Sequence, residues 1–132
     1  MKLFVGLLNV MMTVAFLLSV AVQYNDPDPL AWITIYGLAS ALCVAFALGR
    51  LRWWYALVTS VTALLWAASL LPAFWGLVST AEIFESLGMK TAPVEHAREF
   101  GGLVTVAAWM MFIAFYQRHL DSEASSVDRI DQ

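Results

Sequence analysis

Hydrophobic positions gather in four long stretches that are separated by short polar segments. A helix that crosses the hydrocarbon core of a bilayer needs about 20 mostly apolar residues. The predicted spans cover residues 3–22, 30–48, 53–76 and 100–116. No polar–apolar alternation indicates strands, and in lipid a helix satisfies its own backbone hydrogen bonds. The pattern therefore predicts an all-α integral membrane protein built as a four-helix bundle.

The polar segments suggest how the chain is divided. In the third loop, residues 78–89 mix apolar and acidic positions in a way that suits a short helix lying in the membrane interface. After the fourth span, the chain is rich in Ser and Asp and has no apolar face. We therefore expect a transmembrane domain over residues 1–120 and a frayed, solvated cytoplasmic tail over residues 121–132.

Basic residues indicate the orientation of the bundle. They lie before the first span, between the second and third, and after the fourth, at Lys2, Arg50, Arg52 and Arg118. The loop at residues 23–29 has none. The positive-inside rule then predicts that both termini are cytoplasmic and that the first and third loops share the extracytoplasmic face. We expect a multi-pass protein of the bacterial inner membrane.

The first span has a rival interpretation as a secretory signal peptide. A Lys precedes an apolar run, and Ser19 and Ala21 are small residues near its end. The apolar run is longer than the roughly 7–15 residues of a usual signal-peptide core. We therefore expect an uncleaved membrane helix.

Composition and charge narrow the range of possible functions. Hydrophobic residues make up 61% of the chain and the mean hydropathy is +0.75, outside the range of soluble domains. The lipid bilayer is thus the expected partner, and other membrane subunits or a second copy of the chain are candidate further partners. The net charge is −3 and no basic patch indicates nucleic acid. No Asp, Glu, Lys or Arg lies within a span, which disfavours an ion pump.

The first loop contains the string Gln23, Tyr24, Asn25, Asp26, Pro27, Asp28, Pro29. Asp28 precedes a proline that fits the first position of a helix, so it is placed to cap that helix. Asn25 and Asp26 either close an Asx turn or act as ligands. Two carboxylates on a stiff loop can bind a hard cation such as Ca²⁺ or Mg²⁺.

A second polar group precedes the fourth span. Glu95, Arg98 and Glu99 are three and four residues apart, a spacing that predicts one helical face. Gly102 and Trp109 continue this face, and the glycine allows a neighbouring helix to approach closely. We therefore expect the acidic face to pack inward and meet the first loop. His96 lies about 100° away on the helix and is expected to be an exposed interfacial residue.

Two interpretations of this polar cluster stay open. In one, Arg98 forms an ion-pair clamp with Glu95 and with Asp26 or Asp28, in an accessory or assembly subunit of a larger membrane complex. In the other, the cluster binds a small polar ligand or a divalent cation (Ca, Mg or Zn), with the metal ligands Asp26, Asp28, Glu95 and Glu99. A hydrolase or isomerase is disfavoured because no nucleophile is paired with a general base.

Together the two groups resemble the transmembrane protein 220 family. The resemblance rests on Gln23, Asn25, Asp26 and Asp28 followed by Trp32 and Tyr36, and on Glu95, Arg98 and Glu99 followed by Gly102, Leu103 and Trp109. It covers about residues 5–116. It implies a small multi-helix membrane protein whose characteristic site is formed by Gln23, Asn25, Asp26, Asp28, Glu95, Arg98 and Glu99. It supplies no activity or cofactor, and His96 is not part of the pattern.

Overall fold

The described part of the chain folds into four long helices. The computed structural model describes residues 2–26, 28–77 and 92–130. In chain order the elements are α1 (Lys2–Val22), the 3₁₀ turn η1 (Gln23–Asn25), α2 (Pro29–Ala47), α3 (Trp53–Phe74) and α5 (Ala92–Ile130). Each of the four long helices is apolar and long enough to cross a membrane. The predicted all-helical membrane architecture is confirmed.

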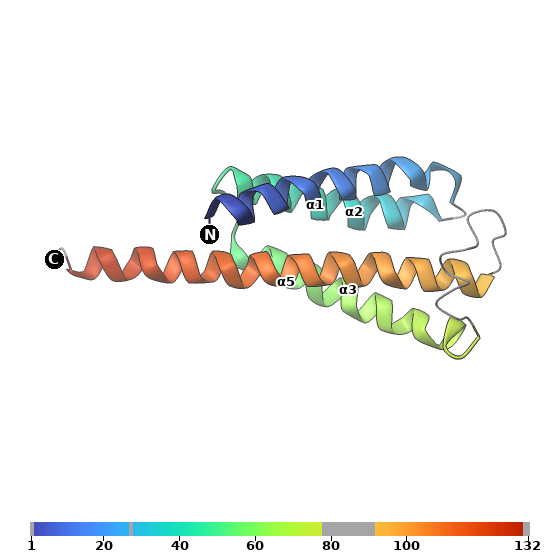
Figure 1. Cartoon of the computed structure of the whole chain (residues 1–132). Coiled ribbons are helices and arrows are strands. Elements are labelled where there is room, and N and C mark those ends of the chain that lie inside the picture. The colour runs from blue at the N-terminus through green and yellow to red at the C-terminus, as the bar shows by residue number, and fades with distance from the viewer. Residues whose placement is uncertain (1, 27, 78–91, 131–132) are drawn as a thin grey trace.

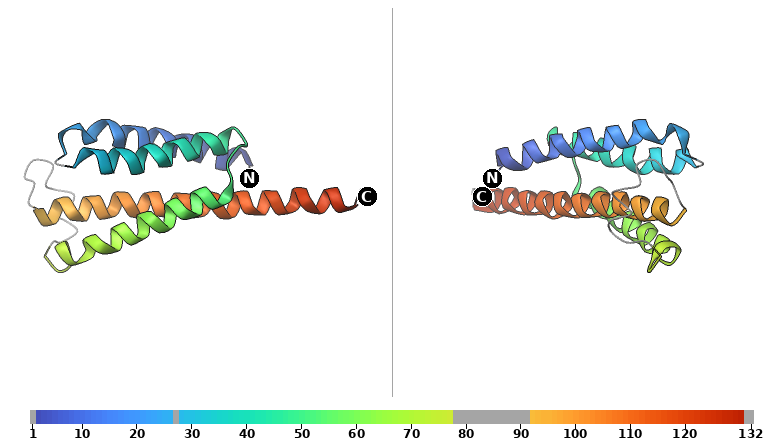
Figure 2. Two further views of the ribbon diagram at one scale, coloured as in Figure 1. Left: turned by 180° about the vertical axis from the view of Figure 1, so that it is seen from behind. Right: turned by 45° about the vertical axis from the view of Figure 1, so that its right-hand side comes forward.

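The helices form two antiparallel pairs. Figure 1 shows α1 with α2 lying over α3 with α5, and the two pairs keep this arrangement in the other views (Figure 2). The N-terminus and the connection between α2 and α3 lie at one end of the bundle (Figure 1). At the other end, the last turn of α1 lies near the beginning of α5, although the two are far apart in the sequence (Figure 1).

The core between α3 and α5 is built from one stripe on each helix. Large apolar residues three or four apart are fully buried on α5: Leu103, Val106, Met110 and Ile113. Small residues with the same spacing are buried on α3: Ala56, Ser60, Ala63 and Ala67. Small side chains let two membrane helices approach closely. A hydrogen bond of 2.7 Å from Ser60 Oγ to the carbonyl oxygen of Ala107 joins the pair.

The pair formed by α1 and α2 has its own polar link. Asn9 is 1% exposed, and its Nδ2 donates a hydrogen bond of 2.8 Å to the carbonyl oxygen of Cys43. Closer to the turn between α1 and α2, the rings of Phe16 and Tyr36 stack with centroids 6.4 Å apart. In the described residues, each pair is thus held by a buried interhelical hydrogen bond together with apolar packing.

The end of the chain is helical. The prediction of a frayed tail is wrong, because α5 continues to Ile130 as a helix of 39 residues. Side-chain pairs four residues apart support the extension: His119 lies 3.4 Å from Glu123, and Gln117 donates to Asp121 at 2.8 Å. The predicted interfacial helix at residues 78–89 lies outside the described residues.

Candidate functional site

The site begins with the turn that connects α1 to α2. The backbone N–H of Asp26 donates to the carbonyl oxygen of Gln23 at 3.0 Å, which closes η1. The backbone N–H of Asp28 then donates to Oδ1 of Asp26 at 3.2 Å. This bond is the Asx turn that the sequence left open. Asp28 occupies the N-cap position of α2, as predicted, but its side chain makes no capping hydrogen bond.

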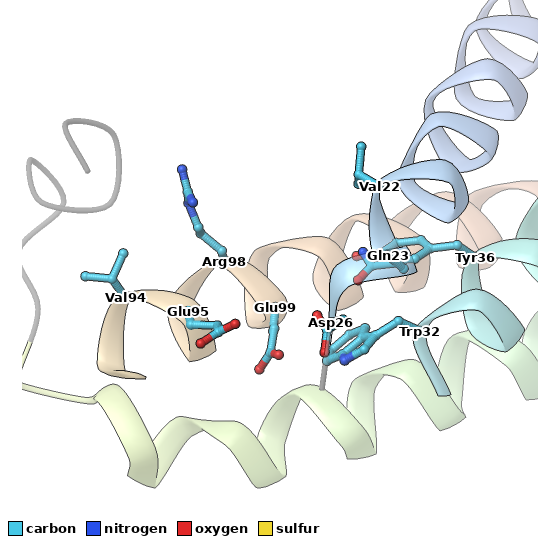
Figure 3. Close-up of a pocket in the computed structure, with 9 residues that line it drawn as sticks. All are labelled: Val22, Gln23, Asp26, Trp32, Tyr36, Val94, Glu95, Arg98 and Glu99. Carbon is cyan, nitrogen blue, oxygen red and sulfur yellow. The ribbon is translucent and has the colours of Figure 1, made fainter. Parts of the chain in front are cut away.

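A cavity of about 310 Å³ lies between this turn and the first turns of α5. Its polar lining comes from both segments: Gln23, Asp26, Glu95, Arg98 and Glu99. Trp32 and Tyr36 of α2 provide an aromatic wall (Figure 3). The structure therefore brings together five of the seven residues that the sequence placed in the site.

A second cavity of about 580 Å³ adjoins the first. The two cavities share Trp32 and Glu99 as lining residues. Asp28 and His96 line the second cavity, and Trp66 of α3 stacks on Trp32 with ring centroids 4.5 Å apart. The site is thus a pair of adjacent cavities that share Glu99 and Trp32 as lining residues.

Glu99 is the electrostatic centre of the site. Its half-buried carboxylate lies within electrostatic range of His96 and of three other carboxyl groups, those of Asp26, Glu95 and Asp28. These groups come from α5 and from the turn before α2. Their convergence concentrates negative charge at one end of the bundle.

The predicted ion-pair clamp is not formed. Among the residues that the structure describes, no carboxylate comes within salt-bridge distance of Arg98. In Figure 3 the Arg98 side chain leaves α5 in a different direction from Glu95 and Glu99. Adjacent helix positions diverge by about 100°, so Arg98 and Glu99 cannot point the same way. Arg98 nevertheless lines the same cavity as Glu95 and Glu99, so the three side chains border one space from diverging directions.

The predicted metal centre is not assembled either. In the described part of the chain, no group of three or more His, Cys, Asp or Glu side chains converges closely enough to hold a metal ion. The reason lies in the first loop, where Asp26 and Asp28 line different cavities. The four carboxylates therefore line the walls of two cavities and do not meet at a single position where they could coordinate one ion.

Gly102 and Trp109 behave as the spacing predicts. Tyr36 packs against Gly102, where a Cβ atom would overlap the tyrosine hydroxyl oxygen. Trp109 is 7% exposed and lies in the same core. The acidic face of α5 therefore continues into the inward-facing stripe of the helix.

Two residues differ from their predicted places. His96 was expected to be exposed, but it is half-buried and lines the second cavity. Its spacing of three residues from Glu99 is the signal that indicates a shared face. Asn25 is exposed and lines none of the cavities described above. Analysis of polar residues alone also missed Trp66, which reaches the site from α3.

A family model described as Transmembrane family 220, helix, matches residues 15–115. The chain belongs to transmembrane family 220. The match covers both sequence groups that carry the resemblance, which is thereby confirmed. No solved structure matches this family 220 protein, so its site is interpreted from its own geometry.

Proposed function

We propose that this protein binds a small organic cation, an ammonium compound, in the acidic site at the end of its helical bundle. The observation that carries the proposal is the cavity of about 310 Å³ in which Asp26, Glu95 and Glu99 meet above Trp32 and Tyr36. The volume is at the lower end of the range for small-molecule sites.

The chemistry of the lining favours a cation. Four carboxylates line the two cavities against a single arginine, Arg98, which lines the first cavity but is directed away from Glu95 and Glu99 (Figure 3). Aromatic faces attract ammonium groups through their quadrupole, and a carboxylate adds a charge-assisted hydrogen bond. An ammonium compound is larger and more diffuse than a metal ion, so it suits acids that surround a space.

The orientation of the bundle is part of the proposal. Arg118 lies over the ring of Trp53 at 5.2 Å, so it is level with the connection that carries Arg50 and Arg52. The positive-inside rule then assigns this end and both termini to the cytoplasm. The acidic site faces the extracytoplasmic side, which for a bacterial inner membrane is the periplasm.

Thermal unfolding in a mild non-ionic detergent tests the proposal. Ethanolamine and choline are the probes, ethylene glycol is the neutral control, and Ca²⁺, Mg²⁺ and Zn²⁺ form a separate arm. Ligand binding to the folded state raises Tm. We expect both ammonium compounds to raise Tm and Glu99→Gln to abolish the rise.

Glu123→Gln is the matched control, because Glu123 is an exposed carboxylate on the same helix at the other end of the bundle. It should leave the rise unchanged. An equal rise in all three proteins would show that the ammonium effect is nonspecific. A Glu99-dependent rise with metal ions alone would replace the organic cation with a divalent one.

A second candidate function is that of an accessory subunit in a membrane complex. It is favoured by the extension of α5 beyond the other helices (Figure 1), where residues 121–127 are all exposed. Such a helix offers a polar surface to a partner outside the membrane. Mild-detergent purification of the full chain and of a chain truncated after Leu120 tests this function. Partners retained only by the full chain would support it.

A further inference from the structure

A shallow groove continues the acidic site along the side of the bundle, between α2 and α3. Its volume is about 450 Å³, and its walls include Ile35, Leu38 and Thr62. Leu30, Ala31 and Trp66 line both this groove and the second cavity of the site. The groove therefore lies directly beside the second acidic cavity.

The walls of the groove are mostly apolar, and the hydroxyl groups of its two threonines are bonded to the backbone. The hydroxyl of Thr34 donates to the carbonyl oxygen of Leu30 at 2.6 Å, and that of Thr62 donates to Val58 at 2.9 Å. Both threonines thus direct their donors to their own helices. A groove lined mainly by aliphatic side chains, with its threonine hydroxyls bonded within their own helices, suits a hydrocarbon chain.

The orientation of α3 explains why the groove exists. Figures 1 and 2 show α3 slanting away from α1 and α2 toward its Phe74 end. The stacked rings of Trp32 and Trp66 bridge α2 and α3 near that end. The hollow therefore opens sideways, toward the space that lipid occupies around a membrane bundle.

We propose that the occupant is a membrane lipid whose head group carries an ammonium ion. The head group lies in the acidic cavities beside Glu99 and Asp28, and one acyl chain follows the groove past Trp66 to Leu38. This inference rests on the proposed function and adds the class of ligand. The acidic site lies at the ends of the membrane helices, the depth at which lipid head groups are found.

Charge decides between lipid classes. Asp28 and Glu99 both line the cavity that opens into the groove, so an anionic head group is repelled there and an ammonium group is attracted. The lipid enters laterally and does not have to leave the bilayer. Its chain gains contacts with the groove, while its ammonium group gains a charged partner.

Native mass spectrometry of the full chain in mild detergent tests the inference. The probes are dioleoyl phosphatidylethanolamine and dioleoyl phosphatidylglycerol, which have the same chains and differ in the head group. We expect a preference of about tenfold for the ethanolamine lipid, the size of one charge-assisted hydrogen bond. Glu99→Gln should remove the preference, whereas Glu123→Gln should keep it.

The groove is tested with Leu38→Trp, which fills it. Leu65→Trp is the matched control, because Leu65 is exposed on α3 and does not line the groove. We expect Leu38→Trp to weaken binding of the ethanolamine lipid by about tenfold, equivalent to a few lost methylene contacts. It should leave the rise in Tm with soluble ethanolamine unchanged.

The outcomes separate the two proposals. Ethanolamine binding that depends on Glu99, combined with equal lipid affinities in the two tryptophan variants, overturns the lipid inference and leaves the proposed function intact. Equal affinity for the two lipids in the native chain has the same meaning. Loss of any Glu99 dependence, for both ethanolamine and lipid, overturns both proposals.

Discussion

Tyr36 of α2 lies directly against Gly102 of α5. A Cβ atom built at position 102 overlaps the tyrosine hydroxyl oxygen and comes within 3.2 Å of Cζ. This contact joins the two hairpins one turn below Glu99. The absence of a side chain at position 102 therefore decides where the aromatic wall of the acidic site stands.

Gly102→Ala should displace Tyr36 and destabilise the protein. Overpacking a close contact costs about 1–3 kcal/mol. Gly101→Ala is the matched control, because a Cβ at position 101 meets nothing within 4 Å. Replacing an open helical glycine by alanine stabilises a helix by up to about 1 kcal/mol. Thermal unfolding in detergent should therefore show opposite shifts in Tm for the two variants.

A double variant makes this prediction sharper. Tyr36→Phe removes the oxygen atom that the new methyl group overlaps, so it should restore part of the stability lost in Gly102→Ala. The ring carbon at 3.2 Å keeps the rescue incomplete. Equal Tm values for the two alanine variants would contradict the contact itself.

The hydrogen bond from Ser60 to Ala107 leads to a second prediction. It is buried and joins α3 to α5 at 2.7 Å, whereas Ser69 is exposed and bonds to Trp66 of its own helix. Interhelical hydrogen bonds in membranes contribute about 0.6 kcal/mol on average and up to about 2. Ser60→Ala should lower the free energy of unfolding by about that amount, and Ser69→Ala should leave it unchanged, as measured by equilibrium unfolding in mixed micelles.

Arg98 gives a third prediction. Removing one partner of a buried ion pair costs about 3–5 kcal/mol, but in the described residues Arg98 has no such pair. Arg98→Ala should therefore change the free energy of unfolding by less than about 1 kcal/mol. The same substitution removes a positive charge from the lining of the first cavity, so ethanolamine should bind more tightly. A large loss of stability in this variant would instead support the ion-pair clamp.

The architecture could be predicted from the sequence because each span is decided by local hydropathy. Three predicted spans agree with the helices α1, α2 and α3 to within two residues at each end. The fourth helix is far longer than its apolar part, from Phe100 to Tyr116. Its polar extensions depend on side-chain pairs such as His119 with Glu123, which hydropathy does not register.

The site could be predicted in part. The topology was enough to bring Asp26 near Glu99, because both lie at the same end of the bundle. The spacing of residues along a helix does not give the final direction of each side chain. Arg98 lines the cavity but leaves α5 in a different direction from Glu99, and His96 is half-buried rather than exposed. Trp66 could not be found, since its place beside Trp32 depends on the packing of α3.

The final prediction concerns the two sides of the membrane. Three spans, α2, α3 and α5, separate Asn25 from Ser122, so these exposed positions must lie on opposite sides. In a Cys43→Ser background, Asn25→Cys should react with a membrane-impermeant maleimide in cells whose outer membrane is permeabilised. Ser122→Cys should react only after the inner membrane is opened, because the proposed orientation puts the basic end of the bundle in the cytoplasm. The reverse pattern would place the acidic site in the cytoplasm, and labelling of both positions from one side would contradict the four spans.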